Sequence, residues 1–230
     1  MKDKNKIVVL SLGGSLIVPK TGFDLDFIKN FKSFILKQIK NGFKFVIVCG
    51  GGNTARVYQA AAREVGNLLS DDIDWIGIHA TRLNAHFIRT IFREWAHPIV
   101  VKNPTVKLQW KKPLLIAAGW KPGWSTDYDA VKLATMYGAS TVVNLSNIEY
   151  VYDKDPNKFK DAKKIEKISW KDFRKIVGNK WVPGANLPFD PIASREAQKH
   201  KIKVAVIKGD SFEEMENVLT GKQFKGTFIY

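Results

Sequence analysis

The chain has 230 residues, of which 45% are hydrophobic and 12% aromatic, a composition typical of a globular protein with a sizeable core. No apolar run reaches the roughly 18 residues of a membrane span, so we expect no membrane partner. Cys49 is the sole cysteine, which excludes an intrachain disulfide. Because the first residues also lack a signal-peptide pattern, we expect a protein of the reducing cytoplasm. The 37 Lys and Arg residues outnumber the 22 Asp and Glu residues and give a net charge of +15, which suits an anionic ligand such as a nucleotide.

The spacing of apolar residues predicts strands that alternate with helices along the chain. Strands are expected over 7–12, 43–49, 114–118, 140–145, 203–207 and 227–230. Helices are expected over 24–40, 53–65, 71–95, 127–137, 169–177 and 191–200, with a last helix from 210. Ser70 is expected to cap its helix, and Ser169 and Asp172 resemble a capping box. The alternation predicts an α/β fold in which a mostly parallel central sheet lies between helices, in one domain over 1–230.

Glycine turns follow the first two predicted strands, at Gly13–Gly14 and at 50–52. A glycine after a strand is usually only a tight turn, but two such turns at the carboxyl ends of parallel strands favour an anion site, because backbone amides and helix N-termini meet there. Neither turn has the spacing of a P-loop or of a dinucleotide-binding fingerprint. The sequence therefore predicts phosphate binding by another fold.

A third glycine-containing segment, at 118–127, follows a predicted strand and opens a predicted helix. The hydroxyls of Ser125 and Thr126 can either cap that helix or bind a nucleotide, and Trp120 or Trp124 can lie beside a base.

Six segments, taken in order, resemble the motifs of the bacterial and archaeal UMP kinases, most closely those of the archaeal type, within the amino-acid kinase family. These are LGGS at 12–15, CGGGNTAR at 49–56, WIGIHATRLNA at 75–85, GWKPGWST at 119–126, NIEYVYDKDP at 147–156 and DPIA at 190–193. The resemblance implies the amino-acid-kinase fold and transfer of the ATP γ-phosphate to UMP.

The resemblance also implies roles for the residues at the matching positions. On the ATP side, Gly13, Gly14 and Ser15 would hold the phosphates and Ser146, Tyr152 and Asp155 would contact the adenosine. The catalytic residues would be Gly14, Asp127 and Asp190, the two acids orienting the reacting groups. On the acceptor side, the UMP-binding residues would be Gly51, Gly52, Arg56, Asp74, Thr81, Ser125 and Thr126.

Further properties follow from the same resemblance. Mg²⁺ would accompany ATP and be held mainly by the nucleotide phosphates, without a dedicated protein metal site. The N-terminal half would serve the acceptor and the C-terminal half ATP. Family members commonly form hexamers, so we expect a homo-oligomer, for which Phe27, Phe31 and Phe34 are either an interface or part of the core.

Several positions depart from the family pattern. Ser11 stands where bacterial and many archaeal members have a lysine, and Asn144 stands where bacterial members have a second one. Lys6 and Lys121 are either replacement cations or ordinary surface residues. Glu149–Tyr150 in place of Asp-Gly would put a bulky side chain beside the ATP pocket, and Trp124 with Tyr128–Asp129 would enlarge and charge the acceptor loop.

These departures keep three alternatives open. The first is a kinase of another small phosphate or carboxylate acceptor, and the second is a catalytically impaired nucleotide-binding protein with a regulatory or storage role. The third, a nucleic-acid-binding protein, rests only on the charge, and the basic residues are spread over the whole chain instead of forming one cluster.

Overall fold

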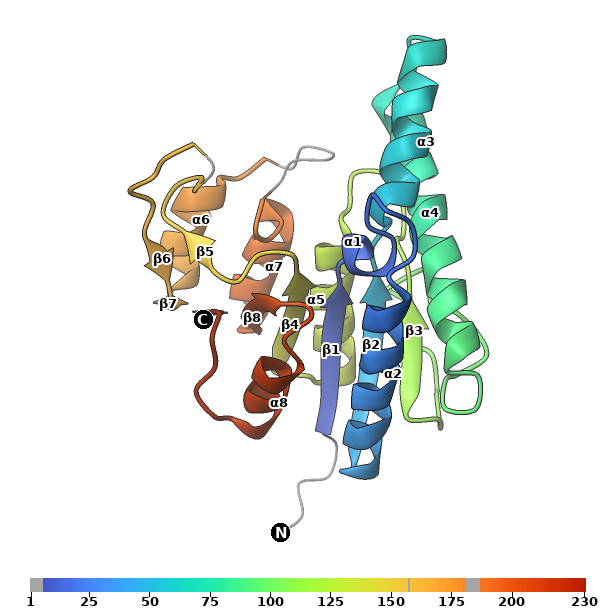
Figure 1. Cartoon of the computed structure of the whole chain (residues 1–230), viewed down its shortest axis with the longest axis vertical. Coiled ribbons are helices and arrows are strands. Elements are labelled where there is room, and N and C mark those ends of the chain that lie inside the picture. Colours follow the sequence, from blue (N-terminus) through green and yellow to red (C-terminus); the bar gives the residue numbers. More distant parts are fainter. Residues whose placement is uncertain (1–5, 157, 181–186) are drawn as a thin grey trace.

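The computed structural model describes residues 6–156, 158–180 and 187–230, and within these residues a seven-stranded sheet forms the centre of the molecule (Figure 1). Its strands lie in the order β3-β2-β1-β4-β8-β9-β7, and only the β8–β9 pair is antiparallel. Their bounds are β1 Lys6–Leu12, β2 Phe43–Cys49, β3 Leu114–Ala117, β4 Thr141–Ser146, β7 Lys167–Ile168, β8 Lys203–Lys208 and β9 Thr227–Ile229. The short strands β5 Val151–Tyr152 and β6 Lys164–Ile165 form a separate antiparallel pair. The prediction of a mostly parallel α/β sheet is confirmed.

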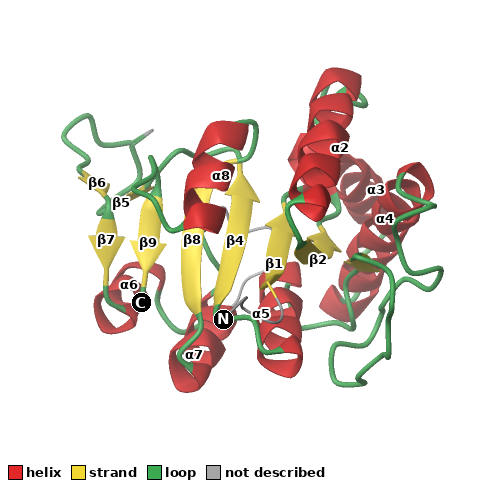
Figure 2. Ribbon diagram, turned by 90° about the horizontal axis from the view of Figure 1, so that it is seen from below, coloured by secondary structure: helices red, strands yellow, loops and turns green. Residues whose placement is uncertain are grey.

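Helices cover both faces of the sheet (Figure 2). One face packs against α2 Leu25–Lys40, α4 Ser70–Ile91 and α8 Phe212–Thr220. The other packs against α5 Thr126–Tyr137, α6 Trp170–Val177 and α7 Pro191–His200. The short α1 Gly14–Ile17 and the longer α3 Gly52–Val65 follow directly from the ends of β1 and β2. No helix in the described ranges has the length and apolarity needed to cross a membrane.

The alternation of side chains along β1 decides what reaches the site. Leu10 and Leu12 lie in the core beneath α2 and α4, whereas Val9 lies in the core beneath α5 and α7. Ser11 has the same parity as Val9, so its side chain lies on the α5 face. In the parallel register of β1 with β4, Ser11 is the partner of Asn144, and the two polar side chains are therefore neighbours on that face.

The core settles one question about the phenylalanines of α2. Phe27, Phe31 and Phe34 are all buried against the sheet and against α8, and Phe31 is fully enclosed. They are therefore core residues in the folded chain. Cys49 is also fully buried at the end of β2, and burial raises the pKa of its thiol.

Two predictions about α4 are wrong. The helix ends at Ile91 and not at Trp95, because the following residues turn back to join β3: the Leu114 N–H donates to the carbonyl of Trp95 and the His97 N–H to that of Leu114. Ser70 is the first helical residue and makes no side-chain cap, while Leu69 holds the N-cap position. By contrast, the Ser169 hydroxyl accepts from the Asp172 N–H, which confirms that Ser169 caps its helix.

Candidate active site

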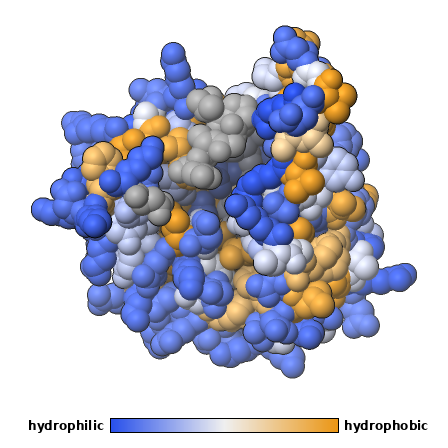
Figure 3. Space-filling model, turned by 45° about the horizontal axis from the view of Figure 1, so that its top comes forward, coloured by the Kyte–Doolittle hydropathy of each residue, from blue (hydrophilic) through white to orange (hydrophobic). Residues whose placement is uncertain are grey.

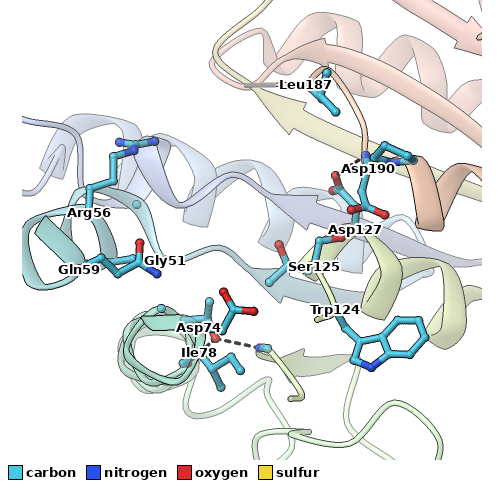
Figure 4. A pocket seen from close by; sticks show the side chains of 17 residues that line it. Gly51, Arg56, Gln59, Asp74, Ile78, Trp124, Ser125, Asp127, Leu187 and Asp190 are labelled. Carbon is cyan, nitrogen blue, oxygen red and sulfur yellow. Dashed lines mark hydrogen bonds between the residues drawn. The ribbon is translucent and has the colours of Figure 1, made fainter. Parts of the chain in front are cut away.

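A cavity of about 330 Å³ opens where β2 and β3 end and where α3, α4, α5 and α7 begin (Figure 4). Because β2 and β3 lie on one side of β1 and β4 and β8 on the other, this is the edge and the switch point at which open parallel sheets bind ligands. The described lining comprises Gly51, Gly52, Ala55, Arg56, Gln59, Asp74, Gly77, Ile78, Thr81, Gly119, Trp124, Ser125, Thr126, Asp127, Leu187, Asp190 and Pro191.

The two glycine turns pack against each other through their backbones. A Cβ atom at Gly14 would overlap the amide nitrogen of Gly52 and the carbonyl of Gly50, so only glycine fits there. Gly52 has a φ of +63°, which a side chain would strain. Asn84 of α4 fixes the second turn by donating from Nδ2 to the carbonyl oxygens of Gly50 and Gly51, at 2.8 and 3.1 Å.

Helix α4 forms a second wall of the cavity and fixes the loop after β3. The Thr81 hydroxyl donates to the carbonyl of Ile78 at 2.6 Å and accepts from the Gly119 N–H at 2.8 Å. Two turns earlier on the same face, Asp74 accepts from the Gly123 N–H at 3.0 Å. Burial raises the pKa of Asp74, and the hydrogen bond from Gly123 opposes this. Both ends of the loop are thus tied to α4.

The loop after β3 also rests on a buried acid. Asp129 is almost fully buried and accepts from the Trp120 N–H at 3.2 Å, while Arg82 donates to the Trp120 carbonyl at 2.9 Å. Burial raises the pKa of Asp129 well above its usual range, and the hydrogen bond from Trp120 opposes this. Asp129 supports the loop from beneath and is not among the residues that line the cavity, and that it charges the acceptor loop stays a prediction. The aromatic part of that expectation holds, since Trp124 lines the cavity with its ring centroid 4.1 Å from that of Tyr128.

Two carboxyl groups close the end of the cavity opposite Arg56 (Figure 4). Asp127 Oδ1 accepts from the Ser11 hydroxyl at 2.9 Å and from Asn144 Nδ2 at 3.3 Å, and Asp127 Oδ2 accepts from the Asp190 N–H at 3.3 Å. Asp190 caps α7 by accepting from the Ala193 N–H at 2.6 Å. Burial raises the pKa of Asp127 to about 7; repulsion from Asp190 adds to this, and the bond from Ser11 opposes it.

The chain shows clear similarity to known proteins. Residues 6–208 match the model of the amino acid kinase family. The chain belongs to the amino acid kinase family. It is 35% identical over 226 residues to a uridylate kinase of Methanococcus aeolicus and 36% identical over 230 residues to one of Methanocaldococcus jannaschii, in each case over 96% of this chain and 98% of the relative. Its fold matches the crystal structure of the uridylate kinase of Archaeoglobus fulgidus with a TM-score of 0.80 and 30% identity, over 97% of this chain and 99% of that one.

Membership of the amino acid kinase family confirms the predicted fold and the predicted resemblance to archaeal UMP kinases. The cavity brings together the residues predicted to bind the acceptor and two of the three predicted catalytic residues. These nine are Gly51, Gly52, Arg56, Asp74, Thr81, Ser125, Thr126, Asp127 and Asp190. The third, Gly14, lies behind the lining in contact with the second glycine turn.

The residues predicted to bind ATP lie outside the described lining of this cavity. Gly13 and Ser15 belong to the turn after β1, where the Gly13 N–H donates to the carbonyl of Leu145 at 2.9 Å. Ser146 ends β4, Tyr152 lies in β5, and Asp155 lies in the turn that follows. These residues therefore lie at or after the ends of β1 and β4, and none of them lines the cavity.

The positions that depart from the family pattern are also placed. Lys6 and Lys121 are exposed and do not line the cavity; the ammonium of Lys121 lies 4.2 Å from the ring centroid of Trp120. They are surface residues, and Arg56 is the sole cation of the described lining. Tyr150 is buried in the protein, with Lys164 over its ring.

Sequence reasoning missed two residues of the site and the buried position of a third. Asn84 lies in one of the six motifs, but nothing in the sequence shows that it binds the glycine turn. Gln59, whose amide donates to the carbonyl of Ile73 at 2.9 Å, joins α3 to α4 beside the cavity. Asp129 carries the loop after β3, and its position within an apolar helix face was the signal that it is buried.

Proposed function

We propose that the protein is an ATP-dependent UMP kinase that transfers the γ-phosphate of ATP to UMP and releases ADP and UDP. The observation that carries this proposal is the convergence, in one cavity, of the seven residues that the motifs assign to the acceptor. The uridylate kinases that the chain resembles along nearly their whole length support the same reaction.

The acceptor site has a phosphate end and a nucleoside end. Arg56 supplies the positive charge for the acceptor phosphate, together with the backbone of Gly51 and Gly52 at the start of α3. Asp74, Thr81 and the helix start at Ser125 and Thr126 face the nucleoside, whose hydroxyl and imide groups need such partners. Trp124 forms an aromatic wall against which the base packs.

Transfer then requires the two phosphates to meet in line at the first glycine turn. Gly13, Gly14 and Ser15 bind the ATP phosphates through backbone amides, and Ser146, Tyr152 and Asp155 hold the adenosine. Asp127 and Asp190, at the same end of the cavity, orient the reacting groups. Phosphoryl transfer needs positioning and charge neutralisation more than covalent chemistry, so no covalent intermediate is required. Mg²⁺ bound with ATP would supply charge neutralisation, and the carboxyl groups of Asp127 and Asp190 at this end of the cavity fit such a cation.

An ADP-release assay with MgATP tests the proposal, using UMP, CMP, dUMP and isopentenyl phosphate as acceptors. We expect turnover with UMP preferred. Arg56→Met should lower kcat/KM for UMP about 10- to 100-fold, because a charge-assisted contact to the phosphate is lost. Arg93→Met, at an exposed arginine after α4, is the matched control and should change nothing. A protein that turns over none of the four acceptors would overturn the proposal.

Two alternatives come from specific residues. Ser11 and Asn144 supply no positive charge beside Asp127, which favours a nucleotide-binding protein with impaired catalysis. Binding of ATP without turnover of any acceptor would establish that reading. Trp124 favours a kinase for a different small phosphate, which a preference for isopentenyl phosphate in the same assay would establish.

We further infer that the chain works in the cytoplasm as a single domain, with its N-terminal half serving the acceptor and its C-terminal half ATP, and as a homo-oligomer, a hexamer by resemblance. Apolar side chains on the projecting arm of α3 and α4 support the oligomer (Figure 3). They include Val57, Tyr58, Val65, Leu69 and Leu83. Size-exclusion chromatography with light scattering tests this: a monomer at micromolar concentration would contradict it.

A further inference from the structure

Asp127 and Asp190 form a buried acidic pair with an unused ligand atom. Asp190 Oδ1 accepts from Ala193, but Asp190 Oδ2 is shielded from solvent and has no hydrogen-bond partner among the described residues. Burial raises the pKa of Asp190, and the Ala193 and Ile192 N–H groups and the Ser125 hydroxyl oppose this. Burying a carboxylate oxygen without a hydrogen-bond partner or a cation costs free energy. We therefore expect a further group to bind beside Asp190 Oδ2.

The charges around the pair do not balance it. Asp127 lies in the first turn of α5 and Asp190 caps α7, so each meets a helix N-terminus worth about half a positive charge. When both carboxyl groups are ionised, about one of the two negative charges is then uncompensated. Ser11 and Asn144 contribute only neutral donors, and Arg56 lies at the other end of the cavity.

We propose that Asp127 and Asp190 bind a divalent cation of the Mg²⁺ and Mn²⁺ class directly, and that they do so before any nucleotide is present. Carboxylate oxygens are the donors that these hard cations prefer. Ser11 and Asn144 hold the Asp127 carboxylate in place from behind. In this proposal the protein itself provides metal ligands, whereas the family resemblance implies that Mg²⁺ is held mainly by the nucleotide phosphates.

The proposed metal site has a consequence that rests on the proposed function. If the cavity accepts UMP and the first glycine turn accepts ATP, the cation lies at the end of the cavity where the phosphoryl group passes. It then supplies, from the protein, the positive charge that Ser11 and Asn144 do not supply. Metal binding itself is independent of that role and can be measured without substrates.

The test is a titration of the EDTA-stripped full chain with Mn²⁺ at about pH 8, without nucleotide, with free Mn²⁺ followed by electron paramagnetic resonance. We expect one Mn²⁺ per chain, displaceable by Mg²⁺. Asp190→Asn and Asp127→Asn should each weaken binding at least about tenfold, and Ser11→Ala by a smaller factor. Asp26→Asn is the matched control, because Asp26 lies exposed on α2 beside Lys29.

The fold of the variants is checked separately. Asn is itself a good helix N-cap, so Asp190→Asn should keep α7 and the wild-type circular dichroism spectrum. As a second readout, Mn²⁺ should raise the melting temperature of the wild type and of Asp26→Asn but not of Asp190→Asn. If Asp190→Asn does not fold, Asp127→Asn decides by the same two readouts.

The outcomes separate the two proposals. Absence of Mn²⁺ binding, or equal binding by the wild type and both site variants, overturns the metal site, even if the protein phosphorylates UMP. Mn²⁺ binding that the site variants lose supports the metal site, even if no acceptor is turned over and the kinase proposal fails.

Discussion

Replacing Asp127 with Asn is expected to stabilise the metal-free protein above pH 7. Burial and the neighbouring Asp190 raise the pKa of Asp127 from an ordinary value of 3.8 to about 7. At pH values between 3.8 and about 7, the Asp127 carboxyl group is protonated in the folded protein and ionised in the unfolded chain. The contribution of the protonated group to the free energy of unfolding is therefore present in full below pH 3.8. It falls by about 1.4 kcal/mol for each pH unit up to about pH 7 and does not change further above that pH.

The structure sets the size of the effect. The full loss across this interval would be about 4 kcal/mol for a carboxylate sealed from water. Asp127 borders the cavity, so solvent there reduces the cost. The Asn side chain keeps one oxygen for Ser11 and Asn144, but its amide group would face the Asp190 N–H, at a cost of about 1–3 kcal/mol. We therefore expect a net gain of about 1–3 kcal/mol above pH 7.

Urea unfolding of both proteins in EDTA, at pH values from about 5 to about 8, measures this gain. The wild type should lose stability relative to Asp127→Asn as the pH rises through this range. The Asp26→Asn protein should follow the wild type at every pH, because that acid is exposed. Two results would refute the reasoning. One is a difference in the free energy of unfolding between wild type and Asp127→Asn that does not change with pH. The other is a wild type that becomes more stable relative to the variant as the pH rises.

Three more predictions follow from contacts of the site. Gly14→Ala should destabilise the protein by about 3 kcal/mol or more in urea unfolding, because its Cβ meets backbone, whereas Gly66→Ala, with open space around it, should not. Thr81→Val should cost about 1–3 kcal/mol by leaving the Gly119 N–H without its acceptor, whereas Thr90→Val on the exposed face of α4 should cost less than about 0.5 kcal/mol. Trp124→Ala should raise KM for UMP about tenfold in the ADP-release assay. It should not change KM for isopentenyl phosphate, which has no base to stack. Equal changes of KM for both acceptors would contradict an aromatic base contact.

Much of the fold was predictable because its strands are buried and end at glycines. The bounds of β2 match the prediction residue for residue, since Phe43–Cys49 is an apolar run between two glycines. The strands β5, β6 and β7 have two residues each, too few to show a period. The end of α4 was missed because Phe92 and Ala96 continue the apolar spacing, although they pack against the sheet after the helix has ended.

The sequence predicted the residues of the candidate site that belong to a single local motif. It did not predict contacts between residues that lie far apart in the chain. The motifs assign seven residues to the acceptor, and all seven line the cavity. The same comparison with the family pattern marks Ser11 and Asn144 only as missing lysines. That both side chains bind Asp127 depends on the register of β1 with β4 and on the placement of α5, and Ser11 lies 116 residues from Asp127. Local sequence patterns do not encode such a contact.

The backbone contact between the glycine turns fixes their spacing independently of the side chains that line the cavity. Gly14 touches Gly50 and Gly52 with no side chain between them, so the spacing of these turns, which we propose bind the donor and the acceptor phosphates, is set by the main chain alone. Substitutions at Trp124 or Asp74 can change which molecule enters the cavity without moving that spacing. A scaffold of this kind can exchange its acceptor over evolutionary time while the spacing of its two glycine turns is inherited unchanged.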